Sequence, residues 1–267
     1  MGWGAIQVRA SDGQDMSMLL EGRFVRWNLG LLAASLVLTP LVTYSLWISD
    51  GCEPYLPFIS DMDLPPRSGL TFTLGYAICG ILMLSFGVQI GILREKWMES
   101  GGVEGRWIAW NRAAMASSVL AGFCLFWISF TPWNEHLELH IVQANVIFIG
   151  SVFWSIVTTV STRRMGQDDP RFEEMLPRRV GFSILGLTGL VGMVERFYRF
   201  TGLSLDMYAL EERLEMLSDS CVNLENSYLS QAAVFEWILA GSMILMLVSF
   251  LPEIELLAPV TPGEDSD

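Results

Sequence analysis

Apolar residues fill six long stretches of this chain, and polar residues collect in the connections between them. A helix needs about 20 apolar residues to cross the roughly 30 Å hydrocarbon core of a bilayer. The six stretches are residues 28–48, 71–93, 113–131, 141–161, 181–199 and 229–251. The pattern therefore predicts an all-α, polytopic membrane protein whose transmembrane bundle covers residues 28–251.

The basic residues alternate between the connections, and this alternation predicts an orientation. Twelve of the sixteen Lys and Arg residues lie in the N-terminal segment 1–27 and in the connections 94–112 and 162–180. Cytosolic connections of membrane proteins carry an excess of Lys and Arg. We therefore expect both termini in the cytosol, with residues 1–27 and the acidic segment 252–267 as cytosolic tails.

Composition and charge narrow the classes of partner. The chain is 52% hydrophobic and only 17% charged, with a formal net charge of −13. The loops on the predicted outer side, 49–70, 132–140 and 200–228, hold twelve acidic residues against two arginines. An acidic face repels anionic surfaces and nucleic acid, so we expect no nucleic acid as a partner, and a solvated face without a binding role would show the same charge. For a membrane protein we expect membrane lipids as partners. The apolar spacing near 203–218 also predicts an amphipathic helix.

The four cysteines divide between the spans and the outer loops. Cys79 and Cys124 fall inside spans, where packing is the expected role. Cys52 and Cys221 fall in the first and third outer loops, and an oxidising compartment would permit a bridge between them. We hypothesise a Cys52–Cys221 disulfide.

A carboxyl group inside the sixth span needs an explanation. Glu236 lies about seven residues from the outer end of that span, and an unpaired acid there costs on the order of 2–3 kcal/mol. A partner or a polar cavity is therefore expected. The candidate partners at the same level are His140, which we favour, and Arg67, Arg196 and Arg199. A structural polar clamp and a functional lipid or proton site both remain open.

The only two histidines stand four residues apart. His136 and His140 would share one face of a helix, which makes them weak candidates for a metal site. Their order with the neighbouring acids does not match the H-E-x-x-H motif of zinc proteases. We predict no metal and no cofactor, and interpret the pair as the start of an interfacial helix.

Arginines cluster in the connection 162–180 on the predicted inner side. The connection contains five arginines, of which Arg163, Arg164, Arg178 and Arg179 are the candidate contact residues. Such a cluster could bind anionic lipid headgroups or a cytosolic protein partner. The excess of basic residues on the cytosolic side would also produce it without either role.

The first outer loop carries a motif that resembles a known family. The motif consists of Pro57, Phe58, Ile59, Ser60 and Asp61. Followed by two prolines and a second span, it resembles the P-[YF]-I-S-D … P signature of the DRAM family of damage-regulated autophagy modulators. His140 at the start of the fourth span, and the pair Glu236-Trp237 in the sixth, are similar to a family histidine and a family Glu-Trp pair. The resemblance covers about residues 28–255.

The resemblance implies a six-span protein of an endomembrane (lysosome, vacuole or Golgi) or of the plasma membrane. The wider superfamily includes autophagy modulators, proteins that help organise a phosphoinositide kinase and lipid asymmetry, and proteins of GPI-anchor lipid remodelling. The leading expectation is a non-enzymatic protein that modulates autophagy, membrane traffic or membrane lipid organisation.

In that interpretation the outer loops cover a lipid-sized cavity. Its expected polar lining is Asp61, His140, Glu236 and Arg67. The first alternative is an enzyme or enzyme subunit of lipid remodelling, with Glu236 and His140 as acid and base. A channel or transporter is the second alternative, which the few charges inside the spans favour less.

Overall fold

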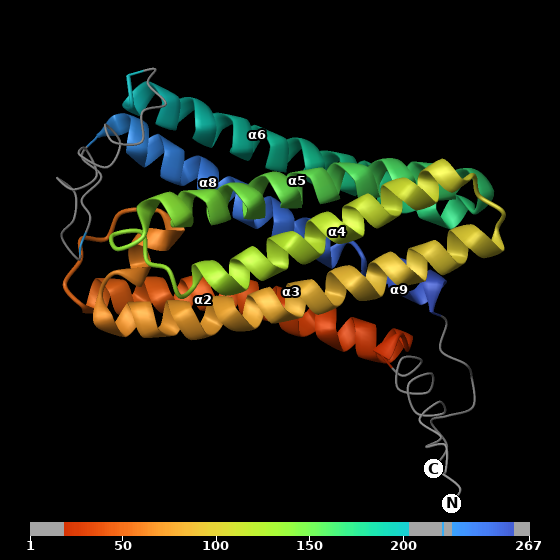
Figure 1. The fold of residues 1–267 in the computed structure, drawn as a ribbon, viewed down its shortest axis with the longest axis horizontal. Coiled ribbons are helices and arrows are strands. Elements are labelled where there is room, and N and C mark those ends of the chain that lie inside the picture. Colours follow the sequence, from red (N-terminus) through yellow and green to blue (C-terminus); the bar gives the residue numbers. More distant parts are fainter. Residues whose placement is uncertain (1–18, 203–220, 222–225, 259–267) are drawn as a thin grey trace, which may run out of the picture.

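The computed structural model describes residues 19–202, 221 and 226–258. Within these ranges the regular structure is helical, and six helices are long and apolar enough to cross a membrane. They run alongside one another as a bundle (Figure 1). They are α2 Gly22–Ser49, α3 Pro66–Ser100, α4 Gly105–Ile128, α5 Leu137–Asp168, α6 Leu176–Phe200 and α8 Ser227–Val248. The all-α, six-span prediction is confirmed, and the cytosolic placement of the termini stays a prediction.

The ends of two spans differ from the hydropathy pattern for a common reason. The predicted spans 113–131 and 229–251 extend three residues beyond α4 and α8. Each of these helices ends four residues before a proline, Pro132 and Pro252 respectively. A proline has no N–H to donate to the carbonyl four residues earlier, so the helical ladder stops there. The amphipathic helix predicted near 203–218 lies outside the described residues.

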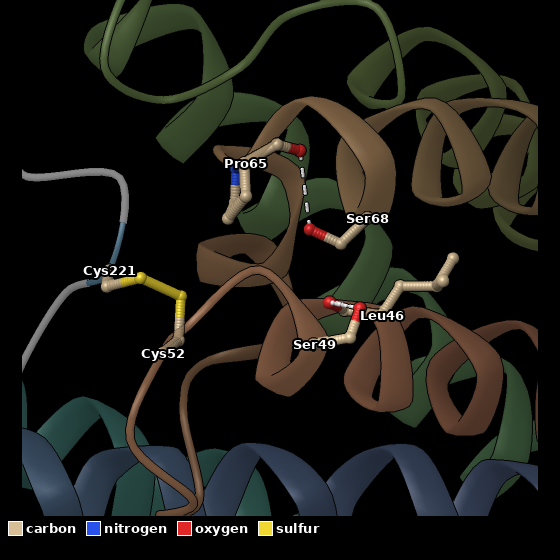
Figure 2. The surroundings of a disulfide bond; sticks show 6 residues. All are labelled: Leu46, Ser49, Cys52, Pro65, Ser68 and Cys221. Carbon is tan, nitrogen blue, oxygen red and sulfur yellow. Dashed lines mark hydrogen bonds between the residues drawn. A yellow bond between two sulfur atoms is a disulfide. The ribbon is translucent and has the colours of Figure 1, made fainter.

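A disulfide joins two of the loops at one end of the bundle. Cys52 and Cys221 are bonded, with their Cα atoms 5.1 Å apart. Figure 2 shows the bond beside the end of α2 and the start of α3. Cys52 is buried in a cluster with Trp47 and Met62. We call this end, which contains residues 50–65 and 129–136, the disulfide end. The hypothesised Cys52–Cys221 pairing is present.

A short helix closes the opposite end of the bundle. This helix, α9 (Leu251–Leu257), follows α8 after a brief turn and packs against α2 and α3. Its Glu253 is completely buried and forms ion pairs with Arg94 of α3, at 2.8 Å, and with Arg179 of α6. One carboxylate on α9 thus holds together two other helices of the bundle. We call this end the α9 end.

Polar and aromatic groups complete the surroundings of this buried triad. Thr162 Oγ1 accepts from Arg94 at 2.7 Å and from Arg179 at 2.6 Å. The Phe250 ring centroid lies 4.0 Å from the guanidinium carbon of Arg179, which adds a cation–π contact. Because a buried charge is costly unless it is paired and hydrogen-bonded, these contacts are needed for the ions to stay in the bundle.

Two sequence expectations fail at the α9 end. The segment 252–267 was expected to be a tail outside the bundle, but residues 252–257 belong to α9, which packs into it. Arg179 does not fit the expected contact with headgroups or a partner, because its side chain is fully buried. Of the other three arginines, Arg163 and Arg178 are exposed and Arg164 pairs with Asp168 at 2.7 Å. A count of basic residues cannot distinguish a charge that faces inward from one that faces outward.

Replacing Glu253 with Ala is expected to destabilise the protein by about 3–5 kcal/mol, because two buried guanidinium groups lose their counterion. The free energy of unfolding in detergent micelles, from a denaturant titration, measures the effect. Glu255→Ala is the matched control on the same helix, since its ion pair with Arg26 is partly exposed. That change should cost less than about 1 kcal/mol. Equal losses in the two variants would contradict a structural role for the triad.

Replacing Cys52 with Ser is expected to lower the free energy of unfolding by about 2–4 kcal/mol, because the bridge restricts a long loop of the unfolded chain. The two bonded residues are 169 positions apart in the sequence. Cys124→Ala, which changes an unbonded cysteine, is the control. A non-reducing mass map of the wild-type protein checks the bond itself, and two free thiols at positions 52 and 221 would refute it.

Candidate functional site

A cavity of about 680 Å³ runs from the disulfide end toward the middle of the bundle. This volume lies within the range of roughly 300–1,000 Å³ that is typical of small-molecule sites. Six spans contribute side chains to its wall, and most of these side chains are apolar. Examples from successive spans are Leu36, Phe72, Leu125, Phe148, Phe197 and Leu239. Residues 58–61 of the first loop line its end.

Two consecutive residues of α8 bind this loop. Glu236 Oε2 accepts a hydrogen bond from the backbone N–H of Ile59 at 2.8 Å. Trp237 Nε1 donates to the backbone carbonyl of Pro57 at 2.8 Å. The Phe58 ring stacks on Phe197 of α6, with ring centroids 5.2 Å apart. The loop is therefore tied to two spans at the place where it covers the cavity.

The partner of Glu236 differs from the sequence expectation. We expected His140 or an arginine, but the hydrogen bond comes from a backbone N–H of the loop. Periodicity can place a carboxyl inside a span, but it carries no information about which loop amide folds back to meet it. His140 does line the same cavity, as do Asp61 and Glu236. The structure thus brings three of the four expected polar residues together.

The Asp61 side chain caps the start of its own short 3₁₀ helix, η1 (Ile59–Asp63). Its Oδ2 accepts a hydrogen bond from the backbone N–H of Phe58 at 3.1 Å. Burial raises the pKa of Asp61 from its ordinary value of 3.8 to about 7, although the Phe58 N–H and the nearby Trp133 indole act in the opposite direction. This carboxyl group therefore changes its charge close to neutral pH.

His140 is held in a defined tautomer. Its Nδ1 lies 2.7 Å from the backbone carbonyl of Thr131. A carbonyl only accepts hydrogen bonds, so we assign the proton of the neutral ring to Nδ1, and Nε2 is left as an acceptor. The side chain is 5% exposed. His140 thus adds a hydrogen-bond acceptor to the cavity wall.

The remaining expected site residues lie outside the cavity. Arg67 is exposed and lies 3.7 Å from Asp50. Arg196 and Arg199 both pair with Glu195 on α6. Among the described residues that line the cavity, there is consequently no Lys or Arg.

The two histidines do not come together as a metal site. His136 is exposed just before α5, whereas His140 is buried one turn later. In the part of the chain that the structure describes, no three His, Cys, Asp or Glu residues are grouped closely enough to hold a metal ion.

Sequence reasoning missed two residues of the site. Trp133 is buried beside Asp61, and Tyr76 lines the cavity from α3. Trp133 had a signal in the sequence, because it is a large aromatic residue in a short loop between two spans. Tyr76 had none, since an aromatic residue in an apolar span has no periodic signature that separates a cavity wall from a lipid-facing side.

The stability of the protein is expected to fall as the pH rises from about 4 to 8. Burial raises the pKa of both Asp61 and Asp63 from 3.8 to about 7. Between these values the folded protein binds protons that the unfolded chain has already released, so a rise in pH favours unfolding. Melting temperatures measured from pH 5 to pH 8 test this direction.

Two variants distinguish the contribution of a loop carboxyl group to the pH dependence from that of carboxyl groups elsewhere in the protein. Asp61→Asn should remove part of the pH dependence, because its amide does not titrate. Asp168→Asn, at an exposed ion pair with Arg164, should leave the pH dependence unchanged. A melting temperature of Asp61→Asn that falls with pH as steeply as that of the wild type would contradict the assignment.

Comparison with known proteins yields one match. No curated protein and no solved structure is significantly similar to the chain. The family model described as the Frag1/DRAM/Sfk1/Cwh43P N-terminal domain matches residues 26–257, which include all six spans and α9. The match also contains the loop motif at 57–61, His140 and the Glu236-Trp237 pair. The chain therefore belongs to the Frag1/DRAM/Sfk1/Cwh43P family of membrane proteins.

Proposed function

We propose that this integral membrane protein binds a membrane lipid in the cavity at its disulfide end, and so modulates membrane lipid organisation or membrane traffic, autophagy included. The observation that carries the proposal is the cavity itself, which combines an apolar wall with a small polar end. That division matches an amphipathic ligand, whose acyl part needs an apolar wall and whose head needs a few polar groups.

The cavity wall reaches the flank of the bundle, which supports a lipid ligand. Val37 and Leu41 of α2 and Val194 of α6 line the cavity, and each is also exposed on the surface. In a membrane such side chains face acyl chains. A lipid can therefore exchange with the cavity sideways, without moving its acyl part through water.

The distribution of charge supports a location for the site. The basic connections lie at the α9 end, and the usual cytosolic excess of Lys and Arg supports a luminal or outer position for the disulfide end. A disulfide there fits an oxidising compartment. The proposed site then opens toward the outer leaflet of the plasma membrane, or toward the luminal leaflet of the lysosome, vacuole or Golgi.

The α9 end offers a second, cytosolic contact surface in this proposal. Arg163 and Arg178 are exposed there, and Arg164 is half-buried. These side chains are suited to anionic lipid headgroups or to an acidic surface on a soluble protein.

An enzymatic role in lipid remodelling is the second candidate. The observation that favours it is the neutral His140 ring, whose Nε2 is a base in a cavity that also contains two carboxyl groups. Such groups can exchange protons with a bound ester or hydroxyl group. The two candidates differ in whether the bound lipid leaves unchanged.

Gly241→Phe tests the proposed function. Gly241 lines the cavity, and a Cβ added there meets no heavy atom within 4 Å, so the new ring can fill ligand space without a clash at its root. Overpacking of about 1–3 kcal/mol corresponds to a roughly 5- to 140-fold loss of bound lipid. Lipid mass spectrometry on the purified full chain measures the amount retained per protein.

Gly30→Phe is the matched control, because Gly30 is exposed on α2, has the same open space and does not line the cavity. It should retain lipid as the wild type does. Equal retention by Gly241→Phe and wild type would refute the proposed site. A chemically changed lipid that disappears with His140→Ala would instead favour the enzyme.

A further inference from the structure

We infer that the cavity selects lipids whose polar group donates hydrogen bonds and carries no negative charge, and that it excludes anionic phospholipids. The inference rests on the proposed lipid binding and adds the chemical class of the ligand. It comes from the kind of polar atoms that meet in the cavity.

Three side chains from three elements bring hydrogen-bond acceptors to the cavity. Asp61 comes from η1, His140 from α5 and Glu236 from α8. A carboxyl group offers acceptor oxygens whether or not it is ionised, and an ionised one only accepts hydrogen bonds. His140 uses its one ring proton toward the Thr131 carbonyl, which leaves Nε2 as an acceptor.

Part of this acceptor capacity is not used by the protein. Glu236 Oε2 is bonded to the Ile59 N–H, and Asp61 Oδ2 to the Phe58 N–H. Within the described ranges, neither Glu236 Oε1 nor His140 Nε2 receives a hydrogen bond. Both residues line the cavity, so a ligand there that supplies O–H or N–H groups fits this site.

The charge of the site disfavours the binding of a lipid with an anionic headgroup. The described lining contains two carboxyl groups and no Lys or Arg. The basic residues at this level, such as Arg67 and Arg199, already pair with acids outside the cavity. A phosphate monoester would therefore find no cationic side chain in this lining. It would be repelled by either carboxyl group when that group is ionised, in a site where apolar walls weaken the screening of like charges. Selection against the anion follows from this repulsion and from the lack of a Lys or Arg partner in the described lining.

A set of lipids with identical dioleoyl tails isolates the contribution of the head. The uncharged donor is dioleoylglycerol, and the cationic donor is dioleoyl-dimethylammonium-propane. The zwitterion without a donor is dioleoyl-phosphatidylcholine, and the anion is dioleoyl-phosphatidic acid. The full chain is purified from micelles that contain all four in equal amounts, and the retained lipids are quantified. The amount retained by Gly241→Phe is subtracted as binding outside the cavity.

At least one donor lipid should be retained over phosphatidic acid by roughly tenfold or more, the ratio that a 1.4 kcal/mol difference produces. Preference for dioleoylglycerol would identify an alcohol as the natural head, and preference for the ammonium lipid an amine. Retention of phosphatidic acid or phosphatidylcholine at the level of both donor lipids would overturn the inference.

The double variant Asp61→Asn/Glu236→Gln tests the cause of the selection, because it removes both charges and keeps both shapes. Discrimination against phosphatidic acid should fall to less than about threefold, while total cavity lipid is retained. Unchanged discrimination would overturn the inference. If the double variant does not fold, Glu236→Gln alone should show part of the same loss of discrimination. No difference between Gly241→Phe and wild type for any lipid would instead refute cavity binding itself.

Discussion

The structure depends on one constraint, which is that a polar group inside a bilayer has no water to bond with and must find its partners within the protein. The bundle meets this constraint differently at its two ends. At the α9 end, Glu253 forms direct ion pairs with both Arg94 and Arg179. At the disulfide end, Glu236 takes its hydrogen bond from a loop amide and leaves one oxygen facing a cavity. At the α9 end the charged groups are paired with one another, whereas at the disulfide end one carboxyl oxygen can still accept a hydrogen bond from a ligand.

The difference between the two ends has a physical meaning. A buried ion triad in which the carboxylate pairs with both cations resists rearrangement, because removal of the shared carboxylate leaves two buried guanidinium groups without a counterion. A carboxylate held by one backbone N–H has acceptor capacity left, and a ligand can use that capacity without breaking the existing bond. The rigid end therefore anchors the helices, and the end with unused acceptors carries the candidate chemistry.

The sequence predicts the framework well because the bilayer imposes it. Six runs of about 20 apolar residues identify the spans, and two outer-loop cysteines identify the disulfide. The site is predicted in part: Asp61, His140 and Glu236 do line one cavity, but Arg67 does not. What the sequence cannot predict is the partner of each buried charge. Glu253 stands one residue after a proline in a polar segment and looks like a tail residue. Its burial follows from the turn after α8, a tertiary feature that no local pattern encodes.

The family motif acquires a physical explanation from these contacts. Pro57 contributes a carbonyl, Ile59 an N–H and Asp61 a carboxylate that caps its own turn. Trp237 donates to the Pro57 carbonyl and Glu236 accepts from the Ile59 N–H, so the loop motif and the Glu-Trp pair form one hydrogen-bonded unit although they lie about 180 residues apart. The unit closes the cavity, and it brings two carboxyl groups to the point of closure. The same bonds that seal the bundle therefore also set the charge that a ligand meets.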